Sequence, residues 1–230
     1  MCGRFVSSQS PQQLADYFGA SIDTDPLAPS YNVAPTNDIY AVVADIEGEP
    51  VVRSFHWGLV PVWAKDVKVG SRMINARAET LAEKPSFKTL FKSRRLIVPM
   101  AGFYEWKTVP GQKAKQPVFI HRADDEPLAV AGLWTVWRDK AAGPDAPWLH
   151  SCTVITVAAN DTMATVHDRM PAILPEQAWE AWLDPDRHDV AELAQLLRPA
   201  PDDLLELVEV STAVNSVRNK GAELIEPLQH

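Results

Sequence analysis

Cys2 carries the most distinctive chemistry in this sequence, because it directly follows the initiator Met1. The initiator methionine is normally removed ahead of a small residue, and the product here would bear an α-amine and a thiol on adjacent carbons. An α-amine has a pKa of about 7.7–8.0 and a thiol one of about 8.5, so we expect both groups to be partly nucleophilic at neutral pH. An aldehyde would form an imine with the amine, and the thiol would then close a five-membered thiazolidine in a favoured intramolecular step. An inert cysteine at position two is the simpler alternative.

Asn75, Arg77 and Glu105 are the first candidates to assist Cys2. Asn75 and Arg77 stand on alternate positions of an extended segment, residues 72–80, which places both side chains on one face. An ordinary half-exposed strand has the same pattern. Glu105 is embedded among aromatic residues, where desolvation raises the pKa of a carboxyl group and lets it act as a general acid. The alternative for Glu105 is a place at the edge of the core, paired with a lysine or an arginine.

His167 begins a second polar group, the sequence His-Asp-Arg-Met-Pro at residues 167–171. Imidazole exchanges protons near neutral pH, so His167 is a candidate proton relay. Capping of a turn is its other interpretation. At the start of the chain, Arg4 places a cation beside the reactive end.

The cations are concentrated in one part of the chain. The net charge is −8, yet residues 53–95 hold ten lysines and arginines against three acidic residues. This basic window fits either a solvated face or a surface that tracks phosphates, where the local field matters more than the net charge. Trp63 lies within the window and is a candidate platform on which unpaired bases stack. Core packing is the alternative for any tryptophan, and Trp57 is the better candidate for it.

Metal sites, cofactor sites and membrane segments are not indicated. The histidines are scattered, Cys2 and Cys152 are isolated, and no metal-binding or Gly-rich phosphate motif occurs, so we expect no metal and no cofactor. The start of the chain lacks the pattern of a secretory signal, and its apolar runs are too short to span a membrane. We therefore predict a cytoplasmic monomer with free thiols, in which Cys152 packs inertly in a strand.

The elements that must position these residues are mostly strands. Runs rich in β-branched and aromatic residues predict strands at residues 39–44, 50–56, 94–98, 117–121, 128–134, 153–157 and 207–210. A first helix is predicted at Pro11–Phe18, with Ser10 as its N-cap and Gly19 after its end. Helical patterns return at residues 175–183 and 190–197, with one more turn at 201–205.

Strands dominate the first two thirds of the chain, and no regular alternation of strand and helix occurs. This arrangement disfavours a doubly wound parallel sheet. The Pro/Gly-rich stretch at residues 143–147 is typical of a hairpin loop, and no long linker divides the chain. We predict a single α+β domain over residues 1–230, with a mainly antiparallel, barrel-like sheet flanked by helices.

Taken in order, these segments resemble one family, the SRAP proteins (SOS-response-associated peptidase-like, abasic-site processing proteins). The matching motifs are MCGRF at residues 1–5, YNVAP at 31–35, WGLVP at 57–61, NARAET at 75–80, GFYEW at 102–106, HDRMP at 167–171 and VRNKGAEL at 217–224. The resemblance is specific, because the motifs are ordered and cover nearly the whole chain. It implies a protein that senses abasic sites in single-stranded DNA, binds them covalently through Cys2 once Met1 is removed, and protects the lesion.

The resemblance also implies a role for each central residue. Cys2 would supply the amine and the thiol to the ring-opened sugar, and Asn75 would hold that amine and the sugar in register. Glu105 would exchange protons with the sugar oxygen and then with the imine, and His167 would assist proton transfer. The peptidase label would reflect removal of Met1, whether by the protein itself or by an aminopeptidase. The implied activity is thus peptidase- and lyase-like.

The DNA-binding residues implied by the resemblance are Arg4, Asn32, Pro35, Trp63, Arg77 and Arg169. The arginines would grip the phosphates beside the lesion, and the other three would shape a kinked strand. The family often has two adjacent aromatic residues where this chain has Trp63 followed by Ala64. That difference concerns base stacking and leaves the chemistry untouched.

Two rival functions remain open on the residues alone. An amidohydrolase with an N-terminal nucleophile, such as a glutamine amidotransferase domain, also begins with Cys-Gly and uses the thiol against an amide carbonyl. Such domains need a two-layer sandwich and an oxyanion hole, and their later motifs are absent from the sequence. A non-catalytic module that binds single-stranded DNA would use Trp63 and the basic window, but it would leave Cys2 and Glu105 without a role.

Overall fold

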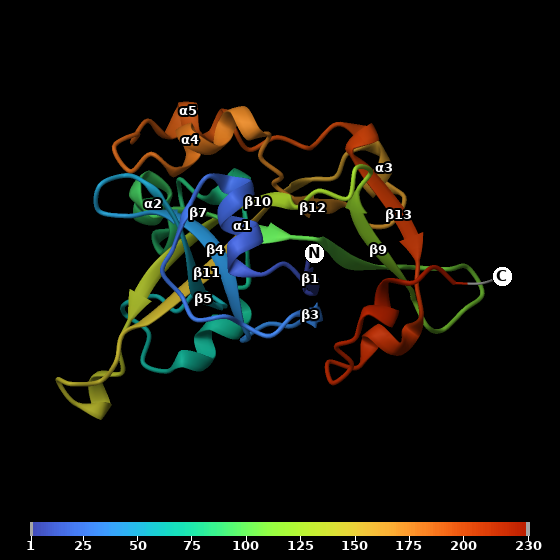
Figure 1. Ribbon diagram of the computed structural model, residues 1–230, viewed down its shortest axis with the longest axis horizontal. Coiled ribbons are helices and arrows are strands. Elements are labelled where there is room, and N and C mark those ends of the chain that lie inside the picture. The colour runs from blue at the N-terminus through green and yellow to red at the C-terminus, as the bar shows by residue number, and fades with distance from the viewer. Residues whose placement is uncertain (1, 229–230) are drawn as a thin grey trace.

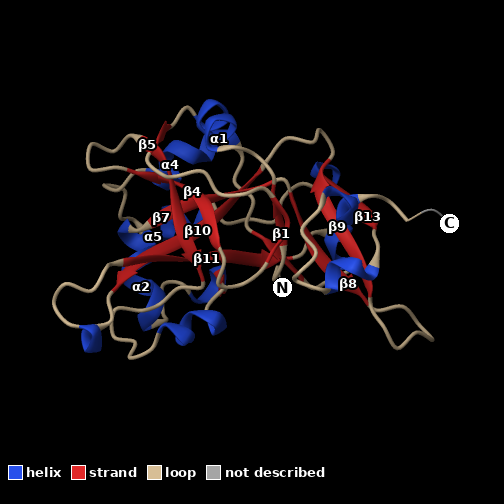
Figure 2. Ribbon diagram, turned by 60° about the horizontal axis from the view of Figure 1, so that its bottom comes forward, coloured by secondary structure: helices blue, strands red, loops and turns tan. Residues whose placement is uncertain are grey.

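The computed structural model describes residues 2–228, and its strands form two β-sheets that meet at β1 (Figures 1 and 2). The strands are β1 Phe5–Ser7, β2 Ser21–Ile22, β3 Ser30–Val33, β4 Asp38–Ala44, β5 Pro50–Trp57, β6 Asn75–Arg77, β7 Arg95–Met100, β8 Gly102–Lys107, β9 Gln116–Arg122, β10 Leu128–Trp137, β11 Leu149–Ala158, β12 Arg169–Pro171 and β13 Leu205–Glu209. The α-helices are α1 Pro11–Phe18, α2 Pro85–Ser93, α3 Asp161–Ala164, α4 Trp179–Leu183 and α5 Val190–Gln195. Short 3-10 helices are η1 Val67–Arg72, η2 Ala78–Thr80, η3 Lys140–Ala142, η4 Glu176–Ala178, η5 Asp202–Leu204, η6 Thr212–Asn215 and η7 Ala222–Ile225.

The larger sheet closes on itself. Its strands follow the order β11-β10-β7-β4-β5, and a parallel pairing of Cys152 with Trp57 joins β5 back to β11. Closure leaves these strands without the unpaired edges that promote aggregation. The smaller sheet is open, in the order β13-β9-β8-β1-β3. The predicted α+β fold with a mainly antiparallel, barrel-like sheet is confirmed, and the structure adds the second sheet and the parallel pairings β2–β5, β5–β11 and β6–β11.

One hydrophobic core extends across the seam between the sheets. It joins barrel residues such as Val42 and Leu133 to Phe5 and Phe103 of the smaller sheet, and Cys2 belongs to the same cluster. Trp57 is fully buried, as predicted, and its indole Nε1 donates a hydrogen bond of 3.1 Å to a backbone carbonyl. The shared core supports the predicted single domain over residues 1–230, which stays a prediction. No helix in the described part of the chain is long and apolar enough to cross a membrane.

The first helix forms as local signals predict. Ser10 accepts from the backbone N–H of Gln13, and the Gln13 side chain accepts from the backbone of Ser10, which completes a capping box. Gly19 ends the helix in the left-handed conformation, with φ 60°. Of the later predicted helices, residues 175–183 divide into η4 and α4, residues 190–197 end at Gln195, and the turn at 201–205 is η5. Helices α2 and α3 were not predicted.

Two glycines close the long loop between β5 and β6, which carries Trp63. Gly58 has φ 133°, and a Cβ on Gly70 would lie 2.4 Å from the Gly58 carbonyl oxygen. One residue after Gly58, the Leu59 N–H bonds the Met73 carbonyl at 3.2 Å. The loop therefore returns to its starting point by direct backbone contact, which leaves no room for a side chain.

Gly70→Ala should lower the free energy of unfolding by about 1–3 kcal/mol, because the added methyl group must push two backbones apart. Denaturant unfolding measures this change. Gly221→Ala is the matched control, since a Cβ there meets only the carboxylate end of the flexible Glu223 side chain. Equal loss in both variants would show that the Gly58–Gly70 contact does not constrain the loop.

Candidate active site around Cys2

Cys2 lies at the seam between the two sheets, just before β1, with 1% of its surface exposed. Met1 lies outside the described residues. The Asn75 side chain, on β6, donates a hydrogen bond of 2.8 Å from Nδ2 to the Cys2 carbonyl oxygen. On the other side, the Tyr104 N–H donates to the Arg4 carbonyl at 2.9 Å, which sets the register between β8 and the first residues of the chain. Glu105 follows Tyr104 directly, so β8 carries its carboxylate to the level of Cys2.

Glu105 shares the buried environment of Cys2, with 4% of its surface exposed. Burial raises the pKa of the Cys2 thiol far above its ordinary value, and the charge of Glu105 raises it further. Burial therefore works against the partial ionisation expected of this thiol at neutral pH. A buried thiol reacts only as its proton moves to an acceptor. Glu105 is the carboxylate whose field reaches the sulfur.

Asn75 is held in place by the barrel. Its strand β6 pairs in parallel with β11, where Asn75 lies opposite Val154. The side-chain Oδ1 atom is buried and has no hydrogen-bond partner in the described part of the structure. A buried unpaired acceptor is costly, and such groups cluster at sites that bind something else. Beside Cys2, this oxygen is placed to accept from an amine.

Arg4 belongs to a cationic cluster that reaches the C-terminal segment. Its Nη1 donates to the Asn32 side chain at 3.0 Å and to the Val214 carbonyl at 3.1 Å. Lys220 donates from Nζ to the Asn32 carbonyl oxygen. Burial, and then the charge of Arg4, lowers the pKa of Lys220. Neither cation forms an ion pair with a carboxylate within residues 2–228, so the pair is suited to an anion.

Asn32 is the structural centre of that cluster. It is fully buried, and its Nδ2 donates to the carbonyls of Val214, Ser216 and Asn219 at 3.0–3.1 Å. Asn32 has no exposed surface for a nucleotide, so the part predicted for it in shaping the bound strand would be indirect, and it stays a prediction. Its side chain instead ties Arg4 to the C-terminal segment.

Pro35 and Trp63 lie on two loops at one end of the barrel. The turn that contains Pro35 packs against β5, since the Thr36 N–H donates to the Trp57 carbonyl at 2.8 Å. Thr36 has φ 73°, a left-handed conformation that is rare for a β-branched residue and is typical of functional sites. Trp63 is 65% exposed on the loop that leaves β5, as predicted for a stacking platform.

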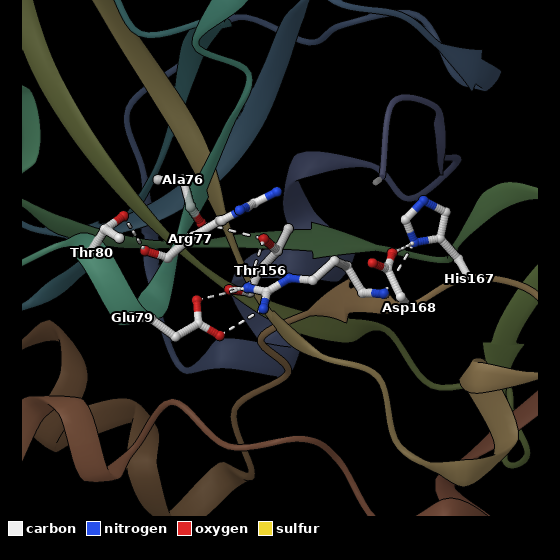
Figure 3. Close-up of polar contacts among 8 residues, drawn as sticks. Ala76, Arg77, Glu79, Thr80, Thr156, His167 and Asp168 are labelled. Carbon is white, nitrogen blue, oxygen red and sulfur yellow. Dashed lines mark hydrogen bonds and ion pairs between the residues drawn. The ribbon is translucent and has the colours of Figure 1, made fainter.

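Arg77 and Arg169 differ in the groups they bind, and Figure 3 labels Arg77 together with Glu79 and Thr156, two partners of Arg169. Arg77 is exposed, and no carboxylate in the described range pairs with it. Arg169 donates to both carboxylate oxygens of Glu79, at 2.6 and 3.0 Å, and to the Thr156 carbonyl at 2.6 Å. The hydrogen bond to Arg169 holds the pKa of Glu79 below its usual value. Arg169 therefore braces β12 against β11 and the start of η2, and little of its guanidinium is left for a phosphate.

His167 lies on the loop that leads into β12. Its Nδ1 atom is 3.0 Å from the backbone nitrogen of Arg169 and 2.9 Å from the Asp168 carboxylate (Figure 3). A neutral ring with Nδ1 as acceptor suits the backbone N–H, and a protonated ring suits the carboxylate. The position has a partner for either protonation state, as a proton relay requires.

The lysines and arginines of the basic window are not all exposed and unpaired. Arg95 is buried and donates to the backbone carbonyls of Phe91 and Trp182. Burial lowers its pKa to about 10. Arg53 pairs with Asp23 at 2.8 Å. The remaining lysines and arginines of the window lie at the surface or, for Arg94, half-buried.

The residues that sequence reasoning missed are Lys220, Trp106 and Trp148. Lys220 stands within the last matched motif, which was the available signal for its role beside Arg4. The Arg4 guanidinium lies 6.0 Å from the centre of the Trp106 ring, a contact set by the pairing of β1 with β8. Trp148 is 58% exposed, in a loop with no periodic pattern to reveal it.

Asn32→Ala should lower the free energy of unfolding by about 2–4 kcal/mol, because the buried Val214 carbonyl, two part-buried carbonyls and Arg4 lose a partner at once. Denaturant unfolding measures the loss, and limited proteolysis should cut first between residues 214 and 219. Asn37→Ala, an exposed change in the neighbouring turn, is the control and should cost less than about 1 kcal/mol. A similar loss in both variants would remove Asn32 from this structural role.

Comparison with known proteins identifies the family to which the chain belongs. The family model described as SOS response associated peptidase (SRAP) matches residues 1–217. The abasic site processing protein YoqW of Bacillus subtilis (strain 168) is 40% identical over 228 residues, covering 98% of this chain and 99% of that protein. The abasic site processing protein HMCES of Gallus gallus is 34% identical over 231 residues, covering 87% of this chain and 67% of that protein. A crystal structure of a Bacteroides thetaiotaomicron protein matches with a TM-score of 0.87 and 25% identity, over 99% of this chain and 100% of that one. The resemblance seen in the motifs is thus confirmed, and the chain belongs to the SOS response associated peptidase (SRAP) family.

Proposed function

We propose that this protein processes abasic sites in single-stranded DNA by forming a covalent thiazolidine crosslink through Cys2. The observation that carries the proposal is the arrangement around Cys2, with Asn75 at 2.8 Å from its carbonyl oxygen and the Glu105 charge acting on its thiol. The relatives named abasic site processing proteins supply the substrate class. Removal of Met1 is part of the proposal, because Cys2 has no free α-amine while Met1 precedes it.

The reaction proceeds in two steps. The α-amine of Cys2 attacks the aldehyde carbon of the ring-opened sugar, and the aldehyde oxygen leaves as water when the imine forms. The thiol sulfur then adds to the imine carbon, and its proton ends on the nitrogen. Glu105 takes the protons that leave the amine and gives them to the departing oxygen; as the ring closes, it takes the thiol proton and passes it to the nitrogen, while Asn75 Oδ1 holds the amine. His167 exchanges protons with the sugar from the β12 side of the site.

Single-stranded DNA is held by cations near Cys2 that have no carboxylate partner among the described residues. Arg77, exposed on β6 two residues from Asn75, is the first phosphate ligand. Arg4 and Lys220, both bound to Asn32, form a second site beside the C-terminal segment. Pro35 and Trp63 border the path of the strand. Arg169 supports this surface through Glu79 rather than by gripping a phosphate.

The amidohydrolase rival has less support in this fold. A glutamine-hydrolysing domain would present its nucleophile between the layers of a sandwich, whereas here a closed barrel stands beside an open sheet. A non-catalytic binding module would leave the buried pairing of Cys2 with Asn75 and Glu105 without a purpose.

A crosslinking gel tests the proposal. Protein whose Met1 is absent by mass spectrometry is incubated with single-stranded DNA in which uracil glycosylase has created an abasic site. We expect a shifted band on a denaturing gel, and no band with the tetrahydrofuran analogue of an abasic site, which has no aldehyde. Cys2→Ala, and a chain extended ahead of Cys2 so that its nitrogen is an amide, should form no thiazolidine.

Two further variants separate the steps of the reaction. Cys2→Ser keeps the amine but loses the thiol, so its product should be an imine that is lost on heating unless borohydride reduces it. Glu105→Gln should slow crosslinking about 10²-fold or more while sparing affinity, because general acid–base catalysis is worth about that much. Glutamine hydrolysis without any shifted band would support the amidohydrolase instead.

The two β-sheet arginines should differ in the salt dependence of DNA binding. In a Cys2→Ala background, Arg77→Gln should reduce the slope of log affinity against log salt by about 0.7, the value for one phosphate contact on a single strand. Arg169→Gln should leave that slope unchanged and lower the free energy of unfolding by about 1–3 kcal/mol, because Glu79 and Thr156 lose a donor. Fluorescence anisotropy over a salt series measures the slopes. An equal reduction in both variants would make Arg169 a phosphate ligand.

A further inference from the structure

A groove of about 450 Å³ lies away from Cys2, and we call it the tryptophan groove. Its walls include Val62, Trp63, Leu90, Arg94 and Trp148. Among the residues that the structure describes, seven large hydrophobic side chains are exposed, and Val62, Trp63 and Trp148 are three of them. Soluble proteins rarely gather exposed apolar side chains without a binding partner. The volume lies in the range of small-ligand sites, roughly 300–1,000 Å³.

Three separate elements build the groove and hold its two exposed indoles in place. They are the loop after β5, helix α2, and the loop between β10 and β11, which projects from the barrel (Figure 1). The indole of Trp137, on β10, donates to the Ala64 carbonyl at 2.8 Å and so ties the Trp63 loop to the barrel. The Arg138 guanidinium lies 4.8 Å from the centre of the Trp148 ring and steadies it by a cation–π contact.

The charge around the groove favours a polyanion. Arg94 is part of the wall, and no carboxylate of the described residues is. Beside the groove, α2 and the residue before it carry lysines at positions 84, 88 and 92, which share one helical face and are exposed. Asp139 and Asp145 stand on the projecting loop but do not line the groove. Exposed aromatic rings among cations are the features by which proteins bind single-stranded nucleic acid without sequence preference.

The groove is connected to the Cys2 site by a short piece of backbone. The Leu59 N–H bonds the Met73 carbonyl, two residues before Asn75, so the loop starts beside the active site. Trp63 is four residues further on, at most about 14 Å of extended chain. A DNA strand fixed at Cys2 can therefore reach the groove within a few nucleotides.

We propose that the tryptophan groove binds unpaired bases of the same DNA strand, beyond the nucleotides that flank the lesion, with Trp148 as a second stacking surface opposite Trp63. This inference rests on the proposed function, because it takes the strand bound at Cys2 as the occupant. A protein partner fits the groove less well, since stable protein interfaces bury roughly 1,200–2,000 Å² and their cores are poor in charge. The groove extends the DNA site from the lesion to a longer single-stranded segment.

Binding of oligonucleotides of increasing length tests the inference. The Cys2→Ala protein is titrated with single strands that carry a central tetrahydrofuran analogue and have from two to ten nucleotides on each side. Affinity should rise once the strand reaches the groove, and Trp148→Ala should then bind about tenfold more weakly, the loss of one stacked base. The difference between the two proteins should shrink toward none for the shortest strand, and Trp148→Phe should restore most of the affinity. Ile46→Ala, a fully exposed change in the β4–β5 turn, is the matched control.

A fluorescent base locates the contact directly. With 2-aminopurine placed at successive positions, we expect quenching at the positions that occupy the groove, and loss of that quenching in Trp148→Ala. Crosslinking of abasic DNA by the Cys2-containing protein is measured in parallel. Crosslinking with no length-dependent effect of Trp148→Ala would overturn the groove proposal and leave the proposed function standing, whereas absence of crosslinking would overturn the proposed function itself. A change of oligomeric state in Trp148→Ala without a change in DNA affinity would make the groove a protein interface and likewise overturn the inference.

Discussion

The hydrogen bond from Asn75 to the Cys2 carbonyl is the interaction on which the site depends, because it crosses the seam between the two sheets. Cys2 leads into β1 of the open sheet, whereas Asn75 belongs to a strand added to the closed barrel. The barrel fixes Asn75 through β11, and the open sheet fixes Cys2 and Glu105 through the pairing of β1 with β8. Neither sheet alone contains the site, so the continuous core that holds the sheets together also sets the geometry of the reacting groups.

Burial determines how Cys2 can react. A thiol in water at neutral pH is partly ionised and attacks electrophiles indiscriminately, but this thiol is desolvated and faces a carboxylate, and both effects keep it protonated. The sulfur becomes a nucleophile only when a neighbour removes its proton. In the proposed reaction, this favours an order in which the amine engages the aldehyde first and the thiol closes the ring second.

Much of the fold was readable from local patterns, and most of the site was not. The capped helix α1 and the barrel strands were predicted because β-branched runs and capping residues act over short distances. Helix α2 was missed because only Phe87 and Phe91 form its buried stripe, within an otherwise polar segment. The burial of Asn32 could not be foreseen, since its partners lie more than 180 residues away in the chain. The adjacency of Cys2, Asn75 and Glu105 came from family resemblance rather than from any spacing.

The positive charge available to bind a ligand depends on which lysines and arginines already interact with other groups of the protein. The basic window has a large formal surplus of positive charge. However, Arg95 donates to backbone carbonyls, and Arg53 forms an ion pair with an aspartate. Arg169, which lies outside the window, forms an ion pair with Glu79. The cations that have no carboxylate partner among the described residues include Arg77, two residues from Asn75, the Arg4–Lys220 pair near Cys2, and the lysines beside the tryptophan groove. Because these three groups border Cys2 and the tryptophan groove, an acidic chain of net charge −8 can still carry a surface path of positive potential.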